Sequence, residues 1–203
     1  MTLNEIVAAY IREYRDAAQA EMDTFRREKS RASAIRRAAW CEFPDGTRHP
    51  HQCLIPKKLL ELAEERLQAA GRRLAGARDF DALNELVERE IGSVQGIGKL
   101  MVYDIAQRIG AYLGKSPKLV YLHRGTKKGA AILGFRGETL DPALLPAEFS
   151  RLTAAEVEDC LSIYKDDLQN ESGRSRRNSR CCVTRRPRPC WGECGALFLS
   201  PIK

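Results

Sequence analysis

The chain has 203 residues, of which 43% are hydrophobic and 30% charged. This length allows one substantial domain or two small ones, and the composition predicts a packed core beneath a soluble surface. No apolar run approaches the roughly 20 residues needed to cross a bilayer, so we expect no membrane association. The net charge is +7, but all but one unit of it lies in residues 170–203, so charge alone does not predict a nucleic-acid partner for the body.

The first residues lack the charged-then-apolar order of a secretory signal peptide, so we expect a cytoplasmic protein without a framework of disulfide bonds. Side chains of the types that bind zinc occur in one short stretch, at Cys41, His49, His51 and Cys53. Their spacing differs from that of common structural sites, in which about two to four residues separate paired ligands. We therefore predict a polar interhelical loop, with zinc as the less favoured alternative, and expect no metal or cofactor.

Capping signals and apolar stripes at helical spacing predict an all-α fold. Thr2 and Thr153 are each followed three residues later by glutamate, which is the capping box that begins a helix. The first box precedes a stripe that predicts one long helix over residues 3–28. Pro56 stands at the favoured first position of another helix, which is expected to end at Gly76.

Two further amphipathic segments, residues 80–91 and 100–113, are joined by the sequence Val-Gln-Gly-Ile-Gly-Lys, and Asp79 or Asp81 is expected to cap the first of them. The two glycines of this linking sequence suit a tight turn, because glycine tolerates positive φ and has no Cβ to block close approach. The amides of such a turn and the positive end of the following helix form a small anion site, beside which a lysine adds a mobile charge. The predicted contacts to a DNA phosphate are Gly96, Ile97, Gly98 and Lys99. The alternative is an ordinary interhelical turn without a ligand.

This stretch resembles the helix-hairpin-helix motif, and the order of elements after it is similar to that of the base-excision DNA glycosylases of the HhH-GPD superfamily. The likeness covers roughly residues 80–135 and includes an apolar run that ends at His123. It implies an all-α scaffold that binds DNA. The catalytic aspartate of that family would fall at Tyr121, and the lysine of its lyase branch would fall near Leu100. Because neither side chain supplies that chemistry, the resemblance implies DNA binding, and we predict no catalytic residue.

A basic stretch over residues 123–129 follows, and we expect it to lie beside the glycine turn. It reads as a loop and a helix N-terminus that meet a second phosphate, or alternatively as a solvated, capped turn. The candidate donors are Arg124, Thr126, Lys127 and Lys128.

The sequence thus predicts a helical domain over residues 1–169, with the helix-hairpin-helix at about 80–113, and a disordered Arg- and Cys-rich tail over 170–203. The leading functional hypothesis is a non-enzymatic module that binds the DNA backbone. One alternative is a glycosylase or lyase with displaced catalytic groups, for which the candidates near the motif are Lys99, Asp104 and His123. The other is a protein-interaction domain that binds no nucleic acid.

Overall fold

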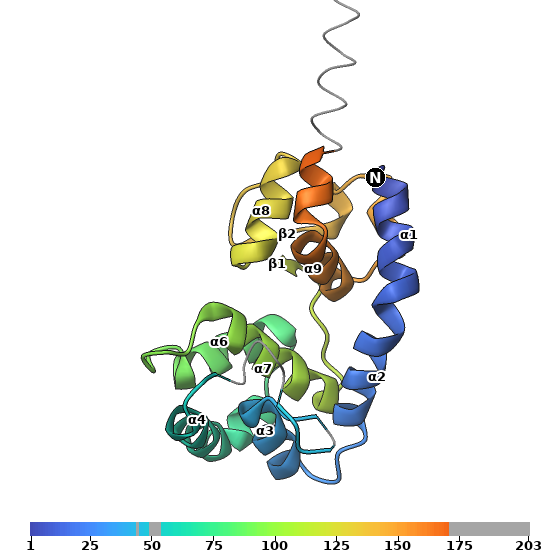
Figure 1. Ribbon diagram of the computed structural model, residues 1–203. Helices are drawn as coiled ribbons and strands as arrows, with labels where there is room; N and C mark the ends of the chain where they lie inside the picture. Colours follow the sequence, from blue (N-terminus) through green and yellow to red (C-terminus); the bar gives the residue numbers. More distant parts are fainter. Residues whose placement is uncertain (44, 49–53, 171–203) are drawn as a thin grey trace, which may run out of the picture.

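The computed structural model describes residues 1–43, 45–48 and 54–170, and these form the predicted helical fold with one small sheet (Figure 1). In chain order the helices are α1 (Leu3–Glu13), α2 (Arg15–Arg26), α3 (Arg31–Trp40), α4 (Lys57–Ala69), α5 (Gly71–Ala75), α6 (Phe80–Ile91), α7 (Lys99–Leu113), α8 (Arg124–Ile132) and α9 (Ala154–Ile163). The strands β1 (Val120–Tyr121) and β2 (Thr139–Leu140) pair antiparallel, and the short 3-10 helices η1 (Pro142–Leu144) and η2 (Ala147–Arg151) follow them. Within these ranges no helix combines the length and the apolar character needed to span a bilayer. The predicted disordered tail lies outside the described residues, apart from Asn170.

The helices form two lobes, each around its own hydrophobic core. The central lobe is built from α3 to α7 and the end of α2, and its core includes Phe25, Leu67 and Ile105. The terminal lobe unites the two ends of the described chain, because α1 packs with the sheet, α8 and α9 around a second core that includes Phe149. Figure 1 shows α1 and α2 running along one side of both lobes, with the segment after α7 as the other connection.

The predicted single helix over residues 3–28 is wrong, because the chain breaks at Tyr14 into α1 and α2. Tyr14 has φ −122° and ψ −33°, outside the helical region. The physical reason is that the two halves bury different faces in different places. Tyr10 of α1 lies in the terminal core, whereas Phe25 of α2 lies in the central core. A straight helix could not bury both side chains in their separate cores.

Local capping chemistry is confirmed at three helix starts. Both predicted capping boxes are present, with the Thr2 and Thr153 hydroxyls accepting from backbone amides and the following glutamates closing each box. Asp79, one of the two predicted caps, accepts from the Ala82 amide at 2.9 Å at the start of α6. The helix after Pro56 is interrupted at Ala70, which divides the predicted element into α4 and α5.

The basic stretch over residues 123–129 is helical from Arg124, so its expected loop is replaced by the first turns of α8. Two of its glycines allow α8 to lie directly against α9. A Cβ on Gly129 would stand 2.3 Å from the Leu161 carbonyl oxygen, and one on Gly125 would stand 2.4 Å from Ser162 Oγ. At Gly129 only a residue without a side chain fits, because the atoms it would meet belong to the backbone of α9. Ser162 near Gly125 can turn its side chain away, so Gly129 is the glycine that sets how closely α8 packs on α9.

Candidate nucleic-acid interface

The turn between α6 and α7 is anchored by apolar side chains and presents its glycines outward. Val94 and Ile97 are each 7% exposed and belong to the central core. The Ile97 amide donates to the Val94 carbonyl at 2.9 Å, which closes the turn. Gly96 has φ +100°, a conformation that favours glycine, and both Gly96 and Gly98 are exposed. The predicted turn geometry is therefore present. Ile97 is corrected as a phosphate contact, because its amide already donates within the turn and its side chain is buried as an anchor.

The start of α7 leaves donors facing outward. Gly98 is the N-cap and offers no side chain to bond the first amides of the helix. Those amides also lack an acceptor within the helix, as at the start of any α-helix. Lys99 and Leu100 are exposed at this point, and Leu100 keeps 43% of its surface. The helix start thus combines unbonded amides, the positive end of the helix dipole and one cation.

A single carboxylate brings the two predicted basic patches together. Glu138 Oε2 lies 3.1 Å from Lys99 Nζ at the glycine turn, and its Oε1 lies 2.7 Å from Lys127 Nζ on α8. Hydrogen bonds from Lys127 and Lys99 lower the pKa of Glu138. Arg124 and Lys128 are exposed on the same helix as Lys127. The starts of α7 and α8 therefore adjoin, and both contribute cations to one surface.

Thr126 departs from the predicted set of phosphate donors. Its side chain is fully buried and its hydroxyl donates to Glu158 Oε1 of α9. The reason is the seating of α8 on the Gly125 and Gly129 side, which carries Thr126 into the contact between the two helices. We therefore correct this assignment, because a buried hydroxyl that already donates to a carboxylate cannot reach a phosphate at the surface.

Three rings lie between α7 and the sheet, and His123 is one of them. Its ring centroid is 4.8 Å from that of Tyr103, and Tyr121 stacks on it at 6.5 Å. Burial lowers the pKa of His123, so the imidazole is neutral at pH 7, and its Nε2 has no hydrogen-bond partner. Tyr121 donates its hydroxyl to Asp81 Oδ1 at 2.7 Å. These contacts show no carboxylate orienting His123 as a general base.

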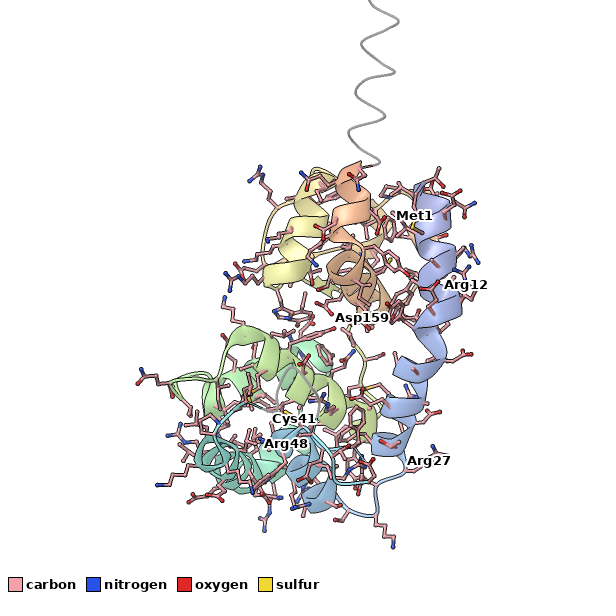
Figure 2. The ribbon with its side chains drawn as sticks, in the orientation of Figure 1. Met1, Arg12, Arg27, Cys41, Arg48 and Asp159 are labelled. Atoms are coloured by element: carbon pink, nitrogen blue, oxygen red, sulfur yellow. The ribbon has the colours of Figure 1, made fainter. Side chains whose placement is uncertain are left out.

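A cleft between the two lobes brings together Asp104, a candidate from the sequence, and two acidic residues that the sequence did not reveal. Asp104, Glu158 and Asp159 line a cavity of about 510 Å³ there, and Leu100 stands at the same cavity. Figure 2 shows Asp159 at the edge of the terminal lobe that faces the central lobe. Burial raises the pKa of both Glu158 and Asp159, and repulsion adds to the rise, from Asp159 on Glu158 and from Asp104 on Asp159. In the sequence, Glu158 stands out only because it lies three residues before Leu161, an apolar residue on the buried face of the same predicted helix.

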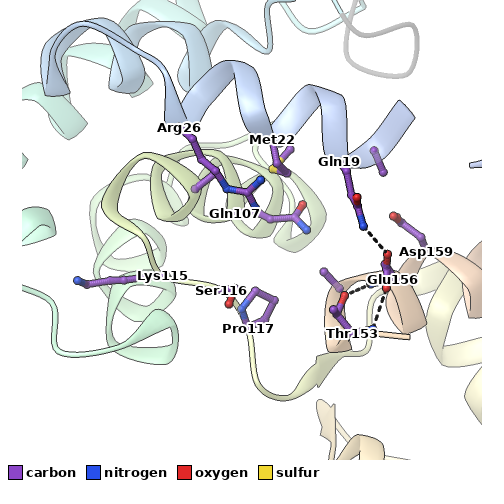
Figure 3. A pocket seen from close by; sticks show the side chains of 13 residues that line it. Gln19, Met22, Arg26, Gln107, Lys115, Ser116, Pro117, Thr153, Glu156 and Asp159 are labelled. Carbon is purple, nitrogen blue, oxygen red and sulfur yellow. Dashed lines mark hydrogen bonds between the residues drawn. The ribbon is translucent and has the colours of Figure 1, made fainter. Parts of the chain in front are cut away.

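An adjoining cavity of about 350 Å³ continues the cleft toward the segment after α7 (Figure 3). Glu156 lies on its wall and accepts from the Thr153 amide at 2.8 Å and from Gln19 Nε2 at 3.3 Å. Arg15 Nε also donates to Glu156 at 2.8 Å. Glu156 therefore ties α2 to α9 across the cleft, and its oxygens are engaged in holding the lobes rather than free for a ligand.

The alternative zinc site cannot be assembled from the described residues. His49, His51 and Cys53 lie outside them, and Cys41 is buried in the central core. Burial raises the pKa of Cys41 to about 11, which keeps its thiol protonated. In the part of the chain that the structure describes, no group of three or more potential ligands is placed to hold a metal ion.

Comparison with known proteins gives no further guide, because no family model matches the chain and no curated protein or solved structure is detectably similar to it. The candidate site is therefore defined by the glycine turn, the adjoining lysines and the cleft alone.

Proposed function

We propose that this protein binds the DNA backbone through the turn between α6 and α7, without catalysis. The observation that carries the proposal is the outward-facing start of α7, where Gly96 and Gly98 expose the backbone and no side chain caps the helix. A phosphate seated there accepts hydrogen bonds from the amides and is held by Lys99. Such contacts position a protein on a duplex and carry no information about base sequence.

The start of α8 extends the surface to a second phosphate. Lys127 meets Lys99 at Glu138, and Arg124 and Lys128 are exposed on the same helix. In the free protein Glu138 forms ion pairs with both lysines. A phosphate must therefore displace its carboxylate from at least one of them. That exchange lowers the affinity and makes it less dependent on salt, because salt screens the competing ion pairs as well as the contact with the phosphate.

Lys99→Glu is expected to weaken duplex binding on the order of tenfold at low salt, equally for unrelated sequences, and to reduce the salt dependence of binding by about one counterion. Fluorescence anisotropy with two unrelated labelled duplexes, titrated over a series of salt concentrations, measures both effects. The matched control is Lys29→Glu, which makes the same charge change on an exposed lysine between α2 and α3. Unchanged duplex binding by the Lys99 variant across the salt series would refute the proposal.

Glu138→Gln gives the reciprocal result. Removing the carboxylate releases Lys99 and Lys127 for phosphate, so duplex affinity is expected to rise a few-fold where Lys99→Glu lowers it. Both changes are at exposed positions, so neither disturbs a core.

The cleft supports a second candidate, a base-excision enzyme with displaced acidic groups. The specific observation is the neighbouring pair Glu158 and Asp159 beside Leu100, with the pKa of each carboxyl raised by burial. A protonated carboxylic acid can donate to a leaving base while a neighbouring carboxylate activates water. We test this by incubating the protein with duplexes that contain damaged bases and measuring base release or strand nicking. Release that is abolished in Glu158→Gln would favour the enzyme, whereas no release from any duplex would leave the binding function.

A further inference from the structure

Glu138 is an anion that lies between cations from both lobes. Its Oε2 lies 3.1 Å from Lys99 Nζ and its Oε1 lies 2.7 Å from Lys127 Nζ, so each oxygen pairs with one lysine. Lys99 begins α7 of the central lobe, whereas Lys127 lies on α8 and Glu138 precedes β2, both in the terminal lobe. The carboxylate therefore marks a position at which one anion meets two ammonium groups from different parts of the fold.

The two helices that supply these lysines also start without acidic groups of their own. The N-caps are Gly98 of α7 and His123 of α8, and neither side chain bonds a first-turn amide. Neither first turn contains an acidic residue. By contrast, α1, α3, α6 and α9 each begin with a side chain that accepts from an amide of the first turn. The positive ends of the α7 and α8 dipoles therefore add to the charge of the two lysines.

Glu138 can leave its position without a change of fold. Its backbone carbonyl accepts from the Leu122 amide at 2.8 Å, which holds the chain at the edge of the sheet. Its side chain is 65% exposed, and among the described residues the two lysines are the groups that donate to its carboxylate. Exposed ion pairs contribute little free energy, because water and salt screen them. A ligand anion can therefore replace this carboxylate while the backbone stays in place.

The number of charges distinguishes the anions that could take this position. Glu138 brings one negative charge to two lysines, and a phosphodiester within a strand also carries only one. A terminal phosphate monoester carries about −1.5 to −2 at pH 7 and has three strong acceptor oxygens. Two of these oxygens can replace Oε1 and Oε2 of the carboxylate, and the third remains for an amide at the start of α7. A dianion therefore balances both lysines, which the resident carboxylate does not.

We propose that Lys99 and Lys127 together bind the terminal phosphate of a DNA strand end, in preference to a phosphate within the strand. This inference rests on the proposed function and adds a substrate class, which is DNA with a phosphorylated strand end. On an uninterrupted strand the two lysines contact separate phosphodiesters. At a phosphorylated end the monoester replaces Glu138 between them and connects the two lobes.

The test compares duplexes that contain a single-nucleotide gap bordered by either a 5′-phosphate or a 5′-hydroxyl, by fluorescence anisotropy with the full chain. We expect the phosphorylated gap to bind on the order of fivefold more tightly at pH 8, which is the effect of one added charge beside two exposed lysines. A second pair of duplexes, with the phosphate on the 3′ side of the gap, covers the opposite strand polarity. A preference for the phosphate at either side supports the proposal.

The preference should shrink at pH 5.5, because the second pKa of a phosphate monoester is about 6 and the ligand then carries about one charge. The titratable groups around the site are Glu138, His123 and the two lysines, and hydrogen bonds from the lysines lower the pKa of Glu138. These groups are present in the complexes with both duplexes, so the ratio of the two affinities isolates the charge of the ligand. A ratio that is the same at both pH values would contradict recognition of a dianion.

Two variants separate a two-lysine site from a generally positive surface. Lys127→Gln leaves Lys99 as the single lysine beside the ligand, so it should reduce the preference to less than about twofold. Arg124→Gln is the matched control, because it removes the same charge from an exposed position on the same helix. Arg124 forms no ion pair with Glu138, so its replacement should lower both affinities alike and keep their ratio.

Equal binding of phosphorylated and unphosphorylated gaps by the parent protein, or a preference that survives Lys127→Gln, would overturn the inference. In either event, loss of intact-duplex binding in Lys99→Glu would still support the backbone phosphate site. Inorganic phosphate distinguishes a strand end from a free anion as the ligand. We expect it to compete weakly, because it lacks the neighbouring phosphodiesters of a strand. Inorganic phosphate that removes the preference at concentrations comparable to that of the duplex would overturn the assignment to a strand end.

Discussion

Replacing Gly129 by alanine is expected to lower the free energy of unfolding by about 3 kcal/mol, although the change adds one methyl group to a helix that should otherwise favour it. The added Cβ would stand 2.3 Å from the Leu161 carbonyl oxygen and 2.9 Å from its carbon. These are backbone atoms of α9, so they cannot rotate aside. The helices must separate, and separation breaks the hydrogen bond from Thr126 to Glu158. Urea denaturation followed by circular dichroism measures the loss.

Alanine substitutions at two other glycines provide comparisons for this loss of stability. Gly125→Ala places its Cβ 2.4 Å from Ser162 Oγ, a side-chain atom that can turn away, so its cost should be smaller than that of Gly129→Ala. Gly98→Ala meets no atom within 4 Å and should cost less than about 1 kcal/mol. Equal stability of the Gly129 and Gly98 variants would show that α8 is not seated against α9 as described.

The seating of α8 also controls the proposed interface. Lys127 lies on the helix face opposite the glycines' contact with α9 and reaches Glu138 at 2.7 Å, which places it beside Lys99. If α8 were displaced, Lys127 would move away and Lys99 would no longer have a second cation beside it. Gly129→Ala should therefore weaken duplex binding in addition to lowering stability, even under conditions in which the protein remains folded.

Elements whose boundaries depend on local chemistry were predictable from the sequence. The start of α6 follows from the Asp79 cap, and the starts of α1 and α9 follow from threonine–glutamate boxes, each of which acts within one helical turn. The glycine turn belongs to the same group, because Gly96 and the apolar anchors on either side of it define its geometry within a few residues.

The remaining features depend on contacts between distant parts of the chain. The break at Tyr14 arises because α1 and α2 bury residues in different cores, and the burial of Thr126 arises because α9 lies against α8. Glu158 was overlooked for the same reason. Its environment is made by Asp104 of α7 and Thr126 of α8, so an isolated helix carrying Glu-Asp looks like an ordinary solvated segment. Local pattern therefore predicted where helices start, and it did not predict which polar groups they enclose.

Glu158→Gln is expected to stabilise the protein at alkaline pH by a few kcal/mol and to flatten the dependence of stability on pH. Burial, with repulsion from Asp159 and Asp104, raises the pKa of Glu158 in the folded state above that of an unfolded glutamate, about 4.3. Between these two pKa values the folded state binds more protons than the unfolded state. Stability therefore falls as pH rises through this window, and each unit of the pKa difference contributes about 1.4 kcal/mol.

Glutamine reproduces the neutral form of Glu158 at every pH. Its oxygen can still accept from Thr126, and its amide can donate to Asp159, which also accepts from the Tyr10 hydroxyl at 3.2 Å. Urea denaturation from pH 5 to pH 9 should show the parent losing stability toward alkaline pH and the variant losing much less. Glu138→Gln removes a carboxylate whose pKa is lowered, so it should leave the parent's alkaline slope intact. A Glu158 variant that follows the parent's slope would mean that this carboxyl is ionised in the folded protein, and the acid role assigned to it in the cleft would fall with that result.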